Sequence, residues 1–305
     1  MMQNCWEKAV RDICSRNGIP FEENVPMSEH TTFKIGGPAR LLLQPENAEQ
    51  LSALLREGHD LPLFFVGRGS NLLVSDQGIS GAVVVLGSAF SGVEVQENVL
   101  ICEAGASLTK VCQTALRQGL SGMEFAYGIP GTVGGAVYMN AGAYGGEIRD
   151  VILWAEYLDQ QGMLHRLSAN ELNLSYRHSC FSELSRKACI VRAAFCLTPG
   201  DPEAIRARME ELMARRKEKQ PLEYPSAGST FKRPEGAYAA ALIDQCGLKG
   251  LRVGNAMVSE KHSGFLINAG GATCAEMEEL IRQVQQTVEQ KTGYRLELEV
   301  LRLGE

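Results

Sequence analysis

The chain has 305 residues, of which 45% are hydrophobic and 22% are charged, the composition of an ordinary folded protein whose length suggests two domains. Its net charge of −6 disfavours a nucleic-acid-binding surface, which would carry clustered Lys and Arg. The nine cysteines are scattered through apolar segments without a C-x-x-C pair or zinc spacing, which predicts reduced thiols in a cytosolic protein.

The first residues, MMQNCWEKAVRDICSRNG, carry charges throughout and have no apolar centre, so we do not expect a signal peptide. No hydrophobic run approaches the length of a membrane span. Apolar residues at helical spacing instead predict a helix over 2–17, which Gly18 can end.

From residue 18 to about residue 200, short strands with inserted helices predict an α+β fold. Strands are expected at 39–43, 63–66, 82–86, 93–96, 99–103, 151–158, 163–167 and 188–197. Two helices are expected, one over 48–57 with Asn47 and Gln50 as a capping box, and one opened by Ser107 and ended by Gly119.

The texture of the sequence changes near residue 200, where Asp201 and Pro202 start a strong helix that runs to about Lys219. We therefore predict a boundary there, with one region over 1–200 and another over 201–305. The second region is expected to hold helices over 238–246 and from the Thr273–Glu276 capping box to Gly293, and strands near 251–258, 264–268 and 294–303.

Residues 127–146, YGIPGTVGGAVYMNAGAYGG, contain seven glycines interleaved with apolar residues. Ordering so much glycine is costly, and a chain keeps such a run where its backbone takes positive φ or lets a ligand approach. Backbone N–H groups in such a segment can bind phosphate. A flexible surface loop is the alternative, but the apolar residues predict a half-buried segment.

A second glycine loop, GRGSNL over 67–72, follows a predicted strand directly. It lacks the third glycine of a dinucleotide fingerprint, and no clear helix follows it. A hairpin turn of small residues is the alternative. Together, the two loops favour a phosphate-bearing cofactor.

Three polar residues could carry chemistry, although each has a plainer explanation. Arg177 follows an apolar stretch and could be a surface arginine, and Ser229 lies in SAGST, which could be a simple turn. Glu299 shares a predicted strand face with Glu297, which usually means a solvated face. None of the five histidines has metal spacing, and no metal site is expected.

Seven blocks of the sequence together resemble the UDP-N-acetylenolpyruvoylglucosamine reductase (UDP-N-acetylmuramate dehydrogenase) family. They span residues 31–304 in the order of the family: TTFKIGGPA, VGRGSNLLVSD, GIPGTVGGAVYMNAGAYGGEI, LSYRHSCF, PSAGSTFKRP, SEKHSGFLIN and LELEVLRLG. The chain resembles the shorter branch, which lacks an inserted loop bearing a tyrosine. The resemblance implies an FAD-binding fold of the para-cresol methylhydroxylase/vanillyl-alcohol oxidase type over 1–200 and a C-terminal α+β substrate-binding domain over 201–305.

The resemblance also implies an activity. Hydride would pass from NADPH through non-covalent FAD to UDP-N-acetylglucosamine enolpyruvate, giving UDP-N-acetylmuramate for peptidoglycan precursor synthesis in the cytoplasm. No nucleic-acid or membrane partner is expected, and the protein is expected to be a monomer.

The same resemblance assigns the site residues. It implies catalytic roles for Arg177, which would stabilise enolate charge, Ser229, which would protonate the α-carbon, and Glu299, which would hold or protonate the carboxylate region. Implied substrate-binding residues are Lys219, Asn268 and Arg233, the last standing where other members can carry Asn. Implied FAD-binding residues are Gly67, Arg68, Gly69, Ser70, Asn71, Leu72, Tyr127, Gly128, Ile129, Pro130, Gly131, Thr132, Gly134, Gly135, Asn140, Ala141 and Gly142.

Two other functions remain open from the sequence. A flavin oxidase of the same superfamily often tethers its flavin through His or Cys, and neither glycine loop contains one. A non-catalytic module that binds flavin or a nucleotide sugar is the second alternative. The joint presence of Arg177, Ser229 and Glu299 argues against such a loss of activity.

Overall fold

The computed structural model describes residues 5–184 and 188–304, which form two compact units. Unit 1 contains the described residues of Met1–Glu23, Leu41–Gly67 and Gly81–Arg215, and unit 2 contains those of Asn24–Arg40, Arg68–Ser80 and Arg216–Glu305. Unit 2 thus includes two short segments from the N-terminal part of the chain, and the division does not follow a single cut near residue 200. As a division of function, that boundary stays a prediction.

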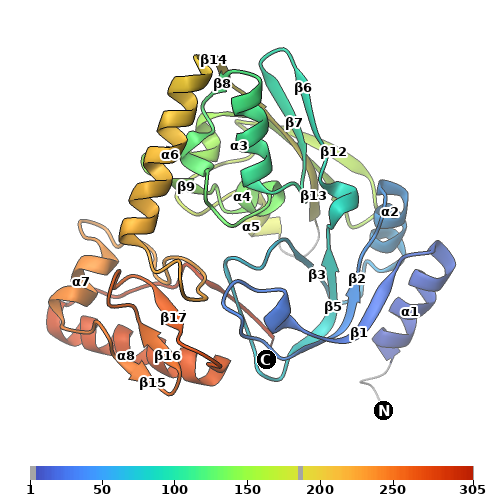
Figure 1. Ribbon diagram of the computed structural model, residues 1–305. Coiled ribbons are helices and arrows are strands. Elements are labelled where there is room, and N and C mark those ends of the chain that lie inside the picture. Colours follow the sequence, from blue (N-terminus) through green and yellow to red (C-terminus); the bar gives the residue numbers. More distant parts are fainter. Residues whose placement is uncertain (1–4, 185–187, 305) are drawn as a thin grey trace. The chain divides into compact units, whose positions relative to one another are not determined.

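The larger sheet of unit 1 has five strands in the order β12-β11-β13-β7-β6, and every neighbouring pair is antiparallel. Its strands are β6 (Val93–Gln96), β7 (Val99–Glu103), β11 (Ile152–Asp159), β12 (Leu164–Ser168) and β13 (Ala188–Cys196). Helix α4 (Val133–Tyr138) packs on β13 and β7, and α3 (Leu108–Arg117) packs on β7 (Figure 1). Because Val133 and Val137 are fully buried there, the glycine-rich segment is anchored in the core of unit 1.

A second core in unit 1 surrounds α1 (Cys5–Asn17) and α2 (Ala48–Glu57), which pack against each other. The adjoining sheet has the strand order β1-β2-β5-β3, and β3 and β5 are parallel. Its strands are β1 (Phe21–Pro26), β2 (Pro38–Leu43), β3 (Leu63–Val66) and β5 (Ile79–Val85). Strand β3 leads directly into the second glycine loop.

Unit 2 is built on the long helix α8 (Cys274–Thr292), which packs on α7 (Ala239–Gln245) and on a three-stranded sheet. The sheet consists of β15 (Arg252–Val253), β16 (Ala256–Val258) and β17 (Leu266–Asn268). The Asp76 carboxylate accepts hydrogen bonds from the backbone N–H groups of Cys274 (2.8 Å) and Ala275 (2.9 Å), so it caps α8. Asp76 follows β4 (Leu72–Val74), which pairs in parallel with β18 (Leu301–Leu303). The second glycine loop is therefore attached to unit 2 at its C-terminal end.

The remaining elements of unit 1 are α6 (Pro202–Lys219), which continues into unit 2, and several short pieces. The short pieces are β8 (Leu120–Ser121), β9 (Gly142–Ala143), β10 (Gly146–Glu147), α5 (Cys180–Leu184) and β14 (Thr198–Pro199).

Among the described residues most predicted elements are confirmed, but two strands at the C-terminal end are not. Residues 2–4 of the helix predicted over 2–17 lie outside the described residues. The strand expected near 251–258 is a hairpin of β15 and β16, because Gly254 takes a φ of +54° and turns the chain. The strand expected over 294–303 is reduced to Leu301–Leu303. Leu296 and Val300 are buried as their alternation predicts, but the intervening chain forms only an isolated bridge, between Leu298 and Phe231.

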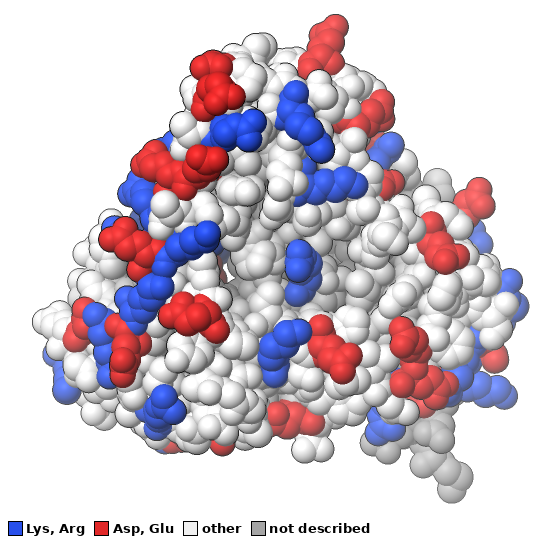
Figure 2. All heavy atoms as spheres, viewed as in Figure 1, with Lys and Arg blue, Asp and Glu red and all other residues white. Residues whose placement is uncertain are grey.

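On the face that Figure 2 shows, Lys and Arg are interspersed with Asp and Glu, so that this face has no single sign of charge. All nine cysteines are free thiols, and burial raises the pKa of Cys102 to about 12. Among the described residues, no helix is long and apolar enough to span a bilayer.

Candidate active site

Arg177 lies in a tight turn of unit 1 that is closed by two backbone hydrogen bonds between Ser175 and His178, each 3.2 Å long. Its backbone takes a φ of +55°, a conformation that costs a non-glycine residue about 1 kcal/mol or more. The half-buried side chain lies 5.1 Å from the ring of Tyr176, and its Nη2 is 3.5 Å from the carbonyl oxygen of Gly142. The arginine is therefore held at the glycine-rich segment, not on open surface.

Part of the backbone of the glycine-rich segment is hydrogen-bonded to other parts of the protein. The N–H groups of Val133 and Gly134 donate to the carbonyl oxygens of Ala106 (2.9 Å) and Ala104 (2.8 Å). These two N–H groups therefore hold the segment in place, and a ligand would have to bind other atoms of the segment. Gly135 is exposed on α4, and a Cβ there would have Thr132 Oγ1, at 3.7 Å, as its nearest neighbour in the protein.

The start of the second glycine loop touches the first. A Cβ at Gly67 would lie 2.5 Å from the hydroxyl oxygen of Thr132, so Gly67 and Thr132 are in close contact within unit 1. In unit 2, Gly69 has a φ of +59°, and a Cβ there would overlap the carbonyl oxygen of His30. The close approach predicted at Gly69 is therefore a contact between the backbone of Gly69 and the backbone of His30.

Ser229 and Glu299, seventy residues apart in the chain, lie on neighbouring backbone segments of unit 2. The N–H of Glu299 donates to the carbonyl oxygen of Thr230 (2.9 Å), next to Ser229. The Asn71 amide donates to the carbonyl oxygen of Glu299 (3.0 Å), which connects the second glycine loop to the same place. Ser229 and Glu299 are both half-buried. The structure thus brings two predicted catalytic residues and one predicted FAD-binding residue together.

The three predicted substrate-binding residues differ in their surroundings. Lys219 is exposed at the end of α6, and Arg233 is exposed with its guanidinium 4.7 Å from the ring of Tyr238. Asn268 is 4% exposed. Its amide donates to the carbonyl oxygens of Phe33 and Lys34 and accepts from the N–H groups of Gly270 and Ala272. These four bonds use its hydrogen-bonding capacity, so Asn268 fastens the TTFK segment.

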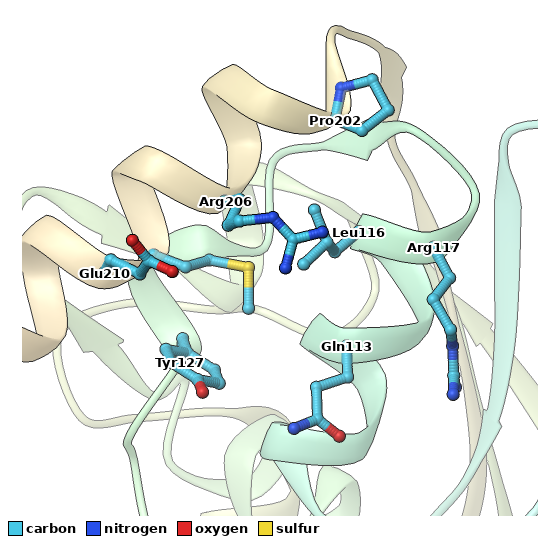
Figure 3. Close-up of a pocket in the computed structure, with 8 residues that line it drawn as sticks. Gln113, Leu116, Arg117, Tyr127, Pro202, Arg206 and Glu210 are labelled. Carbon is cyan, nitrogen blue, oxygen red and sulfur yellow. The ribbon is translucent and has the colours of Figure 1, made fainter.

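A cavity of about 430 Å³ lies in unit 1, between α3 and α6. In Figure 3, the Arg206 side chain reaches from α6 toward Leu116 on α3, whereas the Arg117 side chain points away from both. Its lining residues are Gln113, Leu116, Arg117, Tyr127, Pro202, Arg206, Met209 and Glu210. Of the predicted FAD-binding residues, it contains Tyr127.

Two family models match separate parts of the chain. The model described as "FAD binding domain" matches residues 39–168, and the model described as "UDP-N-acetylenolpyruvoylglucosamine reductase, C-terminal domain" matches residues 220–303. A UDP-N-acetylenolpyruvoylglucosamine reductase of Clostridium novyi is 49% identical over 300 residues, which cover 98% of this chain and 96% of the relative. The chain belongs to the UDP-N-acetylenolpyruvoylglucosamine reductase family.

Other members agree with this assignment. The reductase of Caldanaerobacter subterraneus subsp. tengcongensis is 50% identical over 285 residues, 92% of this chain and 93% of the relative. The crystal structure of the reductase from Thermus caldophilus superimposes with a TM-score of 0.82 at 37% identity, and covers 93% of this chain and 99% of that one. The predicted family and fold class, an FAD-binding domain followed by the C-terminal domain of these reductases, are confirmed.

The residues of this member of the reductase family fit FAD. The buried hydroxyl of Thr32 has no hydrogen-bond partner in the described protein, and the Thr32 N–H donates to the carbonyl oxygen of Gly69. A buried unpaired hydroxyl is costly unless a ligand atom meets it. An FAD atom beside the second glycine loop would give this hydroxyl a partner. No role for Thr32 was predicted from the sequence, although it lies in the TTFKIGGPA block, because burial of one hydroxyl has no sequence signal.

Gly135 allows a test of cofactor binding that leaves the fold intact. In Gly135→Ala the added methyl group has room in the protein, and alanine favours the helix by up to about 1 kcal/mol, so the melting temperature of the FAD-free protein should not fall. If FAD lies against this face of α4, the methyl group overpacks the contact at a cost of about 1–3 kcal/mol. We therefore expect FAD affinity to fall about tenfold or more, measured by fluorescence titration.

The matched control is Gly87→Ala, since a Cβ at Gly87 also meets open space at a negative φ. It should leave FAD affinity unchanged. Equal affinity in both variants would place FAD away from Gly135. Gly69 is unsuitable for this purpose, because its positive φ and the His30 carbonyl would make any side chain disturb unit 2 itself.

Proposed function

We propose that this chain catalyses the NADPH-dependent reduction of UDP-N-acetylglucosamine enolpyruvate to UDP-N-acetylmuramate, with non-covalent FAD as cofactor. The proposal rests on one observation above the others: 49% identity to a reductase of that name over 98% of the chain. We further propose that the reaction takes place in the cytoplasm, in the precursor synthesis of peptidoglycan, and that the enzyme acts as a monomer.

When bound, FAD would supply the hydride, taken from NADPH, that reduces the β-carbon of the enolpyruvyl ether. Negative charge then develops on the oxygens of the substrate carboxylate. The guanidinium of Arg177 stabilises that charge, because its position is fixed in advance by the turn and little reorganisation is needed as the charge forms. A fixed donor of this kind is worth about 3–4 kcal/mol.

Ser229 donates a proton to the α-carbon of the substrate and so sets the new stereocentre. A hydroxyl is a weak acid, but a positioned one suffices against an enolate carbon. Glu299 acts as a neutral hydrogen-bond donor at the substrate carboxylate, since an ionised carboxylate beside developing negative charge would oppose the reaction. Support for this pairing comes from the hydrogen bond between Glu299 N–H and Thr230, the neighbour of Ser229.

The proposed binding roles follow the boundary predicted near residue 200. Residues 1–200 serve mainly FAD binding and residues 201–305 mainly substrate binding. Lys219 and Arg233, both exposed cations, bind anionic groups of the substrate, whereas Asn268 contributes through the TTFK segment that it fastens.

A spectrum and one assay test the proposed function. The purified protein should show a flavin spectrum, release FAD on acid treatment, and oxidise NADPH only when the enolpyruvyl substrate is present. Reduction of the flavin by simple hydroxy acids or alcohols in place of NADPH would identify a flavin oxidase. Bound FAD without any turnover of NADPH and substrate would identify a binding module.

A further inference from the structure

Two fully buried side chains join the turn of Arg177 to the glycine-rich segment, one on each side of the arginine. The amide of Asn140 donates to the carbonyl oxygen of Ser175 (3.0 Å), two residues before Arg177. The hydroxyl of Ser179, two residues after it, donates to the carbonyl oxygen of Tyr138 (2.7 Å). Asn140 and Ser179 are both 0% exposed. Both ends of the turn are thus bound to the two residues that flank Met139.

The remaining capacity of the Asn140 side chain is used inside unit 1 as well. Its Nδ2 also donates to the Glu147 carboxylate (3.0 Å), and its Oδ1 accepts from the N–H of Arg149 (2.9 Å). Both amide protons are therefore spent on protein oxygens. Asn140 was predicted from the sequence to bind FAD, but a direct hydrogen bond from its side-chain amide to FAD would require one of these bonds to break.

The backbone of the turn needs such support. Arg177 has a φ of +55°, which is unfavourable for a residue of its type, and Asn140 has a φ of +42°, which asparagine tolerates better than most residues. A strained conformation persists only where its surroundings hold it. The bonds from Asn140 and Ser179 supply that restraint beside Gly142, whose carbonyl oxygen Arg177 approaches.

We propose that Asn140 is a positioning residue that, together with Ser179, sets the place of the Arg177 guanidinium relative to the FAD-binding segment. This inference rests on the proposed function, because the part of Arg177 in substrate reduction is itself proposed. Asn140 acts through Arg177 and touches neither FAD nor substrate. Its loss should slow the step that needs Arg177 and leave the other steps intact.

The test uses the FAD-loaded enzyme and the variant Asn140→Gly, which removes the amide but tolerates the positive φ. Stopped-flow measurements separate reduction of the flavin by NADPH from its reoxidation by the enolpyruvyl substrate. Because displacement of a catalytic group by about 1 Å can cost a hundredfold, we expect reoxidation to slow about ten- to a hundredfold. FAD occupancy and the rate of reduction should stay within about twofold. Ser179→Ala, a smaller change, should act in the same direction.

Asn173→Gly is the matched control. Asn173 also has a positive φ, of +47°, and lies four residues before Arg177, but its side chain is exposed. It should leave both half-reactions unchanged. Hydrogen exchange provides a readout that needs no turnover: amides of the peptide 172–181 should exchange faster in Asn140→Gly than in Asn173→Gly, because the turn loses its restraint.

A double-mutant cycle with Arg177→Ala decides whether Asn140 acts through the arginine. If it does, Asn140→Gly should slow reoxidation by less than about twofold once Arg177 is absent. Independent, multiplicative losses would overturn the inference, and so would lost FAD occupancy with unchanged exchange of the turn, which would make Asn140 a cofactor contact. If Arg177→Ala alone leaves reoxidation unchanged, the proposed role of Arg177 fails, whereas the exchange measurement still reports on Asn140.

Discussion

Replacing Ser229 with alanine is expected to reduce the rate of flavin reoxidation by the enolpyruvyl substrate by about a thousandfold, within the range by which positioned acids accelerate reactions. The proton that we propose Ser229 gives to the α-carbon would have no equally placed source in the variant. Reduction of FAD by NADPH should survive, because that half-reaction needs no proton at the substrate carbon. Stopped-flow absorbance at the flavin band follows the two half-reactions separately.

Ser226→Ala is a suitable control, since Ser226 lies in the same PSAGS loop and is also half-buried. It should affect neither half-reaction to the same extent. If Ser229→Ala slowed flavin reduction as much as reoxidation, Ser229 would be a structural or nicotinamide-binding residue. A fall of the melting temperature in the Ser229 variant alone would favour the structural explanation, because the backbone beside Ser229 is bonded to Glu299.

Arg177→Lys is expected to lower kcat about a hundredfold or more while changing KM far less. A lysine keeps the charge but is a point cation, and it cannot reproduce the planar fork of a guanidinium. The loss is that of one donor directed at developing charge. If Arg177 only anchored the ground-state carboxylate, the substitution would raise KM and leave kcat nearly unchanged. Steady-state kinetics over a range of substrate concentrations distinguish these outcomes.

Arg208→Lys provides the comparison, because Arg208 is exposed on α6 and pairs with Glu211 on the same helix. Both kinetic constants should stay at their original values. Circular dichroism and FAD content should be unchanged in both variants, so that a low kcat in Arg177→Lys cannot be ascribed to lost cofactor. A normal kcat in Arg177→Lys would contradict transition-state stabilisation by this residue.

The elements with local signals are those that the sequence predicted best. Asn47, Ser107 and Thr273 each begin a helix at the predicted residue, because an N-cap acts on backbone only two or three positions away. Helix α4 was not predicted, since its two glycines disfavour a helix locally, and packing of Val133 and Val137 in the core stabilises it instead. At the C-terminal end, the alternation of apolar residues correctly predicted which side chains are buried, but it predicted too long a strand. Such a pattern contains no information on whether a partner strand is present.

By itself, the sequence determined the family, the cofactor class and the chemical types of the candidate catalytic residues, because these are written in motifs of neighbouring residues. Only the tertiary structure decided what those residues touch. The Asn140 amide meets Ser175 thirty-five positions away, and the Asn71 amide meets Glu299 across 228 positions. The tertiary structure also revealed that the Asn268 side chain is hydrogen-bonded to backbone groups. It further showed that the Thr32 hydroxyl is buried without a hydrogen-bond partner in the described protein. The reason is physical: such contacts depend on the path of the chain between the partners, and residue type and local spacing do not specify that path.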